Sequence, residues 1–440
     1  MEPLTRDELA AALRTGHGRA LRHVQQFGLG EVKDLVLNAC LHNQVYDGQI
    51  DDSRAPWLFL MFKDSPYYDE FREAISTDLD KATAWDQIQL LHLLGQMAAA
   101  GDQVARRTLK DAVFAEITEP SEDEDFIVEE WSRLQTLDEF LVLARIAGSR
   151  LLSDPHASAP VGSIAEERKQ EFREALLEHA RVEPALQMYQ EYLRERGWLQ
   201  DHDGPIDRDA IRRESCERHR REYPLERMIK DAEGKEGSYP GRYAYFGQHA
   251  TKQELGLAYA KFLTAQDPEV QMRLLWVFRR APLPEADETV MRLANGPHEG
   301  LRAAAIAALG QIQDDSVHQL ARHKLSRREL LGVDNEALVL LHKNYVKSDA
   351  VLIQSALEAI KPSRDDAHAL GYDLIELSKA QADSTLIGTL KWVYENTPCM
   401  HCRYRALIEL RKYDGVSEEI ARELEFDADD SIRELAQGRA

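Results

Sequence analysis

The chain has 440 residues and a formal net charge of −22, and 30% of its residues are charged. This acidic balance argues against general binding to nucleic acid or anionic lipid, which needs a basic surface, and suits a protein partner with a basic patch. Four cysteines are too few for a disulfide framework and indicate a reducing compartment. Without a signal-peptide-like start or a run of about 18 apolar residues, the sequence predicts a cytoplasmic protein that does not span a membrane.

Capped helices separated by short polar breaks fill the first 115 residues. Thr5 and Glu8 form a capping-box pattern that predicts a helix from about residue 6, and residues 84–99 form a strongly apolar-periodic helix. Between two helices, residues 43–56 predict a polar and aromatic loop. Side chains here can hydrogen-bond and stack on a ligand, so one interpretation is a ligand pocket. The other is a hairpin loop whose Trp57 anchors the following helix. The candidate pocket residues are His42, Asn43, Tyr46, Asp47, Gln49, Arg54 and Trp57.

The middle of the chain lacks a regular repeat. Residues 119–130 form an acidic run, interpreted as a solvated loop or as a docking strip for a basic partner, and residues 153–164 are the best linker candidate. Residues 233–250 combine glycines with aromatic residues and predict an irregular loop. This loop either binds a partner, because rigid aromatic side chains give contact area at low entropy cost, or inserts its rings between the helices. Its candidate binding residues are Tyr239, Arg242, Tyr243, Tyr245 and Phe246.

A recurring frame organises much of the remaining sequence. Each frame position follows an apolar residue and has apolar residues at following offsets that place them on one face of a helix. An Asp or a His lies four positions before most of them, where Asp suits the N-cap of the helix. The frame positions are Arg106, Gln271, Arg302, Arg403 and Arg433, and the residues that precede four of them are Asp102, Asp267, His298 and Asp429.

This frame resembles the HEAT-repeat family, whose first helix opens Asp-x-x-Val-Arg and continues with Ala and Leu at these offsets. The match covers residues 102–113, 267–324 and 397–437, and Gln271 stands where the family has arginine. The resemblance implies an all-α fold, an α-solenoid of antiparallel helix pairs, which is used mostly to bind other macromolecules. We therefore expect an N-terminal helical-repeat block (1–152), an irregular helical middle segment (153–250) and a C-terminal HEAT-like repeat block (251–440).

Two cysteine motifs are candidates for chemistry. Cys399 and Cys402 open a predicted helix, where the helix dipole favours a thiolate. Redox activity, metal binding and simple packing are the three interpretations, and packing is favoured because Cys402 occupies an apolar slot of the frame. A complete zinc site would need ligands that no second motif supplies, so we predict no metal and no cofactor. Cys216 and His219 lie about one helical turn apart, which we interpret as coincidence, because nucleophilic chemistry needs groups from separate segments.

The leading hypothesis is a non-enzymatic scaffold or adaptor that binds another protein through its groove, with Trp276 and Arg279 among the contact residues. It depends on the repeated frame and on the lack of Walker A, HExxH, GxSxG and kinase signatures. One alternative is a HEAT-like DNA-binding enzyme of the alkylpurine glycosylase type, in which Trp276, Arg279, Arg280 and Asp287 act at an extruded base. Another is a regulatory subunit whose N-terminal pocket senses a small molecule.

Overall fold

The computed structural model describes residues 2–48, 51, 53–118, 130–154, 156–157, 159, 168–197, 208–234, 237–327, 330 and 335–438. Every regular element in these ranges is helical, which confirms the predicted all-α class. No helix within the same ranges combines the length and the apolar composition that a membrane crossing requires. Nearly all of the acidic run 119–130, and most of the predicted linker 153–164, lie outside the described residues.

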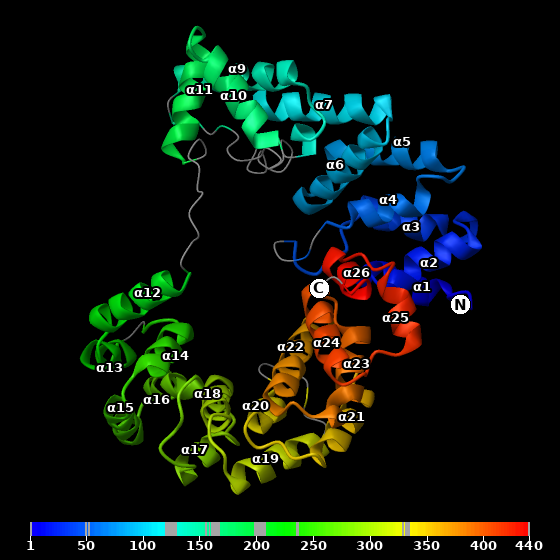
Figure 1. Ribbon diagram of the computed structural model, residues 1–440. Coiled ribbons are helices and arrows are strands. Elements are labelled where there is room, and N and C mark those ends of the chain that lie inside the picture. Colours follow the sequence, from blue (N-terminus) through cyan, green and yellow to red (C-terminus); the bar gives the residue numbers. More distant parts are fainter. Residues whose placement is uncertain are drawn as a thin grey trace. The chain divides into compact units, whose positions relative to one another are not determined.

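The chain divides into two compact units (Figure 1). Unit 1 comprises Met1–Gly204 and Glu418–Ala440, and unit 2 comprises Pro205–Ser417. The three-part division expected from the sequence follows the repeat frame and the candidate linker, whereas these units follow contacts between residues. The helices of unit 1 are α1 (Arg6–Thr15), α2 (Gly18–Phe27), η1 (Gly30–Val32), α3 (Lys33–Leu41), α4 (Ala55–Phe62), α5 (Tyr68–Asp78), η2 (Leu79–Lys81), α6 (Ala84–Ala99), α7 (Gln103–Thr118), α9 (Leu137–Ser153), α10 (Lys169–His179), α11 (Pro184–Glu195), α25 (Glu418–Leu424) and α26 (Asp430–Ala436).

Helices of unit 1 pack against the next helix and against the one after it. α2 contacts α4 and α4 contacts α6, while α1, α3, α5, α7 and α9 contact one another in a second series. The ring of Phe62 on α4 stacks on Phe71 of α5, with centroids 4.5 Å apart. Phe140 of α9 stacks on Phe172 of α10 in the same way, within an apolar core that α9, α10 and α11 share.

The C-terminal helices α25 and α26 belong to unit 1 because α25 packs against α2 (Figure 1). Gly18, at the start of α2, lies against the backbone of α25, and a Cβ atom at this position would be 2.1 Å from the carbonyl oxygen of Glu423. The Arg19 guanidinium donates a hydrogen bond of 2.9 Å to the Glu423 carboxylate. The N–H of Ala428 donates to the carbonyl oxygen of Gly16 at 3.0 Å. The two ends of the chain therefore share one packed interface.

Unit 2 shows the same pattern of contacts. α14, α16, α18, α20, α22 and α24 contact one another in succession, and α19, α21 and α23 form a second series. The helices of unit 2 are α12 (Arg208–Glu222), α13 (Leu225–Glu233), α14 (Pro240–His249), α15 (Lys252–Thr264), α16 (Pro268–Trp276), η4 (Val277–Arg279), α17 (Glu288–Leu293), α18 (Glu299–Leu309), α19 (Asp315–Ser326), α20 (Glu336–Leu341), α21 (Asp349–Glu358), α22 (Arg364–Gln381), η5 (Ser384–Leu386), α23 (Ile387–Asn396) and α24 (Met400–Lys412).

The residues that the frame predicts as N-caps do begin helices. Each accepts a hydrogen bond from a backbone N–H in the first turn of its helix. Cys399 occupies the equivalent place before α24, where its sulfur accepts the N–H of Cys402 at 3.4 Å. The other caps are Asp102 for α7, Asp267 for α16, His298 for α18 and Asp429 for α26.

Three frame positions share a second contact, with the loop before their helix. In each case the side chain donates a hydrogen bond to the carbonyl oxygen six residues earlier. Gln271 therefore keeps the loop contact that arginine makes elsewhere, although it lacks an ion pair such as the one of 2.7 Å between Arg302 and Glu336. The three donor–acceptor pairs are Gln271 with Ala265, Arg302 with Gly296, and Arg433 with Asp427.

Most of residues 233–250 do not form the irregular loop that their composition predicts. Pro240–His249 instead form the helix α14. Pro240 is compatible with this helix because it lies in the first turn, where no backbone N–H is needed for a hydrogen bond within the helix. Gly247 serves packing instead of a turn, since a Cβ atom there would be 1.8 Å from the carbonyl oxygen of Val277. The glycine that suggested a loop thus allows a helix to approach its neighbour.

Candidate functional site

The helix α14 and its N-cap divide the aromatic candidate residues between core and surface. Tyr243 is fully buried and Phe246 is nearly so, whereas Tyr239 is 71% exposed. The guanidinium of Arg242 lies 4.1 Å from the centroid of the Tyr223 ring, at the end of α12. Most of these aromatic side chains therefore hold α14 against α12 instead of extending into solvent.

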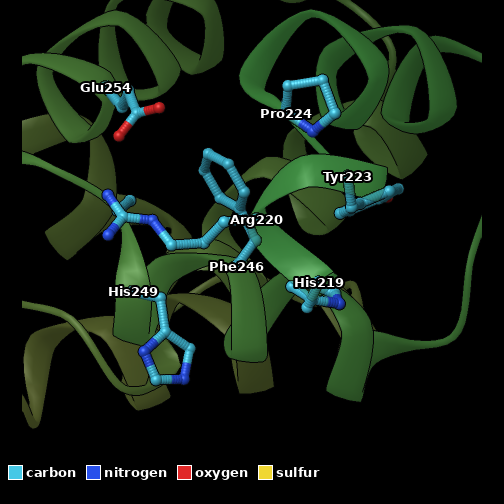
Figure 2. A pocket seen from close by; sticks show the side chains of 8 residues that line it. His219, Arg220, Tyr223, Pro224, Phe246, His249 and Glu254 are labelled. Carbon is cyan, nitrogen blue, oxygen red and sulfur yellow. The ribbon is translucent and has the colours of Figure 1, made fainter. Parts of the chain in front are cut away.

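A small cavity of about 50 Å³ lies where α12, α14 and the start of α15 meet. Figure 2 shows the ring of Phe246 among the side chains of Arg220, Tyr223 and Pro224, with the His249 imidazole at another side of the cavity. Aromatic rings therefore form one part of the cavity wall, and side chains with nitrogen atoms, an imidazole and a guanidinium among them, form another. The lining residues are His219, Arg220, Tyr223, Pro224, Phe246, His249, Ala250 and Glu254.

The charges around this cavity are set by local contacts. Burial lowers the pKa of His219, and the positive charge of Arg242 lowers it further, so the imidazole is neutral at neutral pH. Its Nε2 atom is buried and has no hydrogen-bond partner among the described residues. The Thr251 N–H lowers the pKa of Glu254 by hydrogen bonding to its carboxylate, and Arg220 adds to this effect. The cavity therefore offers a neutral imidazole, a guanidinium and a carboxylate to a ligand.

Cys216 pairs with α14 and not with His219. Its sulfur lies 3.3 Å from the Tyr245 hydroxyl and 3.6 Å from Nε2 of His249. A thiol and an imidazole from separate helices thus meet, as nucleophilic chemistry requires. However, Cys216 lies within α12, whose backbone N–H groups already bond inside the helix and are not available to stabilise an oxyanion. The contact is best explained as a link between α12 and α14.

Two of the N-terminal pocket candidates are buried in the interface that joins the chain ends. Arg54 is 2% exposed, and its Nη1 donates to the carbonyl oxygens of Leu13 and Arg14, at the end of α1. Trp57 is 3% exposed and donates a hydrogen bond to the backbone of Phe426. Both side chains therefore stabilise the packing of unit 1.

The other N-terminal candidates have different partners. The N–H of Asn43 donates to the Asp86 carboxylate at 2.6 Å, and the His42 imidazole lies 3.6 Å from the same carboxylate. Gln49 lies outside the described residues. The backbone N–H groups of two further candidates, Tyr46 and Asp47, face the Asp51 carboxylate.

Trp276, which the sequence suggests as a contact residue of the groove, is largely buried. It is only 8% exposed, and the guanidinium of Arg279 lies 4.9 Å from the centroid of its ring. Arg280 is exposed, and Asp287 caps α17 by accepting the N–H of Thr289 at 2.6 Å. An enzyme that extrudes a base needs an open aromatic face, which Trp276 does not present.

A larger groove, of about 700 Å³, lies in unit 1 at the C-terminal ends of α2 and α4. Leu29 and Met61 are buried in its floor, while Leu60 is 44% exposed. Phe27, at the end of α2 and directly before the lining residue Gly28, is equally exposed. Sequence reasoning missed this groove, although a signal exists: residues 57–62 are all apolar, and one helical face cannot bury six consecutive residues. The lining residues are Val24, Gln25, Gly28, Leu29, Gly30, Leu60, Met61, Lys63, Asp64, Ser65, Pro66 and Tyr67.

A histidine from a distant segment joins the Cys399–Cys402 motif. One potential metal-ligand atom from each of His368, Cys399 and Cys402 lies within 4.8 Å of the other two. None of the four cysteines of the chain forms a disulfide. The sequence alone pointed to the two cysteines and missed the histidine on α22.

Comparison with known protein families finds no family model that matches this chain, and comparison with curated proteins finds no matching relative.

Proposed function

We propose that this protein is a non-enzymatic adaptor built of stacked HEAT-like helix pairs, and that it binds a protein partner in the groove between α2 and α4. The observation that carries the proposal is the exposed apolar side chain of Leu60 in the lining of a groove of about 700 Å³. Phe27, which is also exposed, directly precedes the groove residue Gly28 in the sequence. Water-exposed apolar area around a concave surface gains free energy when a partner covers it, and such areas commonly mark protein-binding sites.

Two observations support the stacked arrangement. In both units, helices contact the next-but-one helix as well as the next one. The frame also places an N-cap aspartate before a helix in both units: Asp102 before α7 in unit 1 and Asp267 before α16 in unit 2. A helix pair that buries its apolar face only against neighbouring pairs is the unit of a repeat protein, and such proteins serve mainly as binding surfaces.

The partner segment that fits this groove carries an apolar side chain next to a Lys or Arg. α2 and α4 both end at the groove, and the carbonyl groups at a helix C-terminus carry partial negative charge. Asp64 adds a carboxylate, which Lys63 partly offsets at 3.8 Å. At longer range, the net charge of −22 attracts a basic partner and speeds its association.

The test compares partner recovery by the tagged full-length protein and by two matched variants. Leu60→Asp places a charge in the groove, and Val351→Asp places the same charge on α21, at a residue that is 73% exposed. We expect one protein to co-purify with the wild type and with Val351→Asp, and its recovery to fall at least about tenfold with Leu60→Asp. Equal recovery with both variants would show that the groove is not the binding site.

Sensing of a small molecule is a second candidate function, favoured by the buried Nε2 atom of His219 that lacks a partner among the described residues. A ligand for the cavity in Figure 2 would combine a ring that packs on Phe246 with an anionic group near Arg220. A panel of aromatic carboxylates, screened by thermal shift, tests this function. Stabilisation should be lost in Arg220→Ala and kept in Arg218→Ala, an exposed arginine on the same helix.

A further inference from the structure

Two packed helices of unit 2 bring three potential metal ligands together. α22 carries His368, and α24 begins with Cys399 at its N-cap and Cys402 in its first turn. The Cys402 sulfur lies 3.7 Å from Nδ1 of His368, and all three ligand atoms lie within 4.8 Å of one another. The ligands therefore come from two different segments, as in a built metal site and unlike an isolated cysteine pair.

The separations suit a tetrahedral ion. Zn²⁺ bonds of about 2.3 Å to sulfur and about 2.0–2.1 Å to nitrogen place neighbouring ligand atoms roughly 3.5–3.8 Å apart. The observed separation of 3.7 Å between Cys402 and His368 falls in this range, and the largest separation of 4.8 Å or less needs only small side-chain rotations. Two thiolates and one imidazole also form a donor set that zinc prefers over hard cations such as Mg²⁺.

The start of α24 places the positive end of a helix dipole beside the two sulfur atoms. The Cys399 sulfur accepts the N–H of Cys402, and the positive end of the helix dipole stabilises negative charge at this place. The two cysteines are only 3% and 2% exposed. A bound cation would offset the cost of burying two thiolates.

We propose that His368, Cys399 and Cys402 bind one Zn²⁺ ion, which connects α22 to α24. Three protein ligands leave one tetrahedral position for a water molecule or an exchangeable ligand. This fourth ligand enters from the side of His368, the only one of the three protein ligands that is not fully buried. The site lies in unit 2, and the proposed partner groove lies in unit 1, so each proposal can fail without the other.

Metal analysis of the full-length protein, purified without chelator and in reducing buffer, tests the site. Wild type should contain about one zinc per chain, and Cys216→Ser should keep it, because Cys216 contacts Tyr245 and His249 instead. His368→Ala and Cys402→Ser should lower the zinc content to below about one-tenth per chain. Equal zinc in all four proteins would overturn the assignment.

Cobalt substitution of the wild type gives a test that needs no variant to fold. After zinc is removed with a chelator, added Co²⁺ should give the near-ultraviolet thiolate-to-cobalt band and the intense visible bands of a tetrahedral site. Circular dichroism checks whether each variant is folded, and His368→Ala, which removes a partly exposed side chain, should lose the cobalt spectrum without losing helix content. A wild type that binds neither metal, or that forms a disulfide between Cys399 and Cys402 in place of binding it, would refute the proposal.

Discussion

The indole nitrogen of Trp57 donates a hydrogen bond of 2.8 Å to the carbonyl oxygen of Phe426, 369 positions further along the chain. The Arg19–Glu423 ion pair, at 2.9 Å, lies in the same interface. These contacts make the C-terminal helices part of the core of unit 1. Loss of this interface should therefore destabilise the N-terminal helices that form the proposed groove.

Replacement of Gly18 by alanine tests the close approach of α2 and α25. The added Cβ atom would lie 2.1 Å from the Glu423 carbonyl oxygen, so backbone must move, and we expect a loss of about 1–3 kcal/mol in the free energy of unfolding. Gly256→Ala is the control, because an added Cβ atom there meets nothing within 4 Å in an exposed part of α15, and alanine should stabilise the helix by about 0.5–1 kcal/mol. Urea unfolding of both variants should show opposite signs.

Asp349 is fully buried and connects α19 to α21. Its carboxylate lies 2.9 Å from Nε2 of His318, accepts the Arg322 guanidinium at 2.8 Å and accepts the N–H of Val346 at 2.9 Å. Asp349→Ala should lower the free energy of unfolding by about 2–4 kcal/mol, because three polar groups lose their acceptor. Asp349→Asn keeps one acceptor oxygen and should cost clearly less; equal losses in thermal or urea unfolding would contradict this assignment.

Three substitutions measure how much stability the frame positions gain from their shared hydrogen bond to the preceding loop. Gln271→Ala should cost about 1 kcal/mol, the value of one hydrogen bond to a carbonyl group. Arg302→Gln should keep the bond to Gly296 and lose the ion pair with Glu336, while Arg302→Ala should lose both. The difference between the two Arg302 variants should match the cost of Gln271→Ala. A mismatch well above the error of urea unfolding would show that the positions are not equivalent.

His92 should make unit 1 sensitive to acid. Burial lowers the pKa of His92 to about 4, with a contribution from the positive charge of Arg133, which is itself paired with Glu130 near the imidazole. The unfolded chain binds this proton near pH 6.5, so it holds more protons than the folded chain between about pH 6.5 and 4. Stability from this group is present above pH 6.5 and falls by about 2–3 kcal/mol as the pH drops to 4.

His92→Gln removes this titration. Urea unfolding of wild type and variant at a series of pH values between 7 and 4 measures the difference. The slope of stability against pH should be smaller in the variant, and identical slopes would show that the folded imidazole titrates normally.

Local features of this fold could be predicted from the sequence because they depend on neighbouring residues. The capping box of Thr5 and Glu8 is present, and the N-cap role of Asp267 and Asp429 follows from their place before an apolar helical face. Gly247 shows where such reasoning stops. A residue without a side chain is required at this position because the carbonyl group of Val277, 30 positions later, lies against it. The local sequence does not distinguish a glycine needed for such packing from a glycine that forms a turn.

The candidate sites could not be predicted for the same reason. His368 joins Cys402 from 34 positions away, and His249 joins Cys216 from 33 positions away, so only the packing of helices brings them together. The apolar lining of the groove depends on which residue of the apolar run 57–62 remains exposed in the fold, and that residue is Leu60. That outcome depends on the path of the following helices.

The central claim, that the groove between α2 and α4 binds a protein, is tested most directly by site-specific photo-crosslinking in the native host. A photoreactive amino acid in place of Leu60 would lie in the groove, and one in place of Val351 would lie at an exposed site on unit 2 as a control. The proposed function predicts one abundant crosslinked protein from position 60, with a basic segment at the crosslink, and none of it from position 351. No crosslink from position 60, or the same products from both positions, would contradict the proposed function.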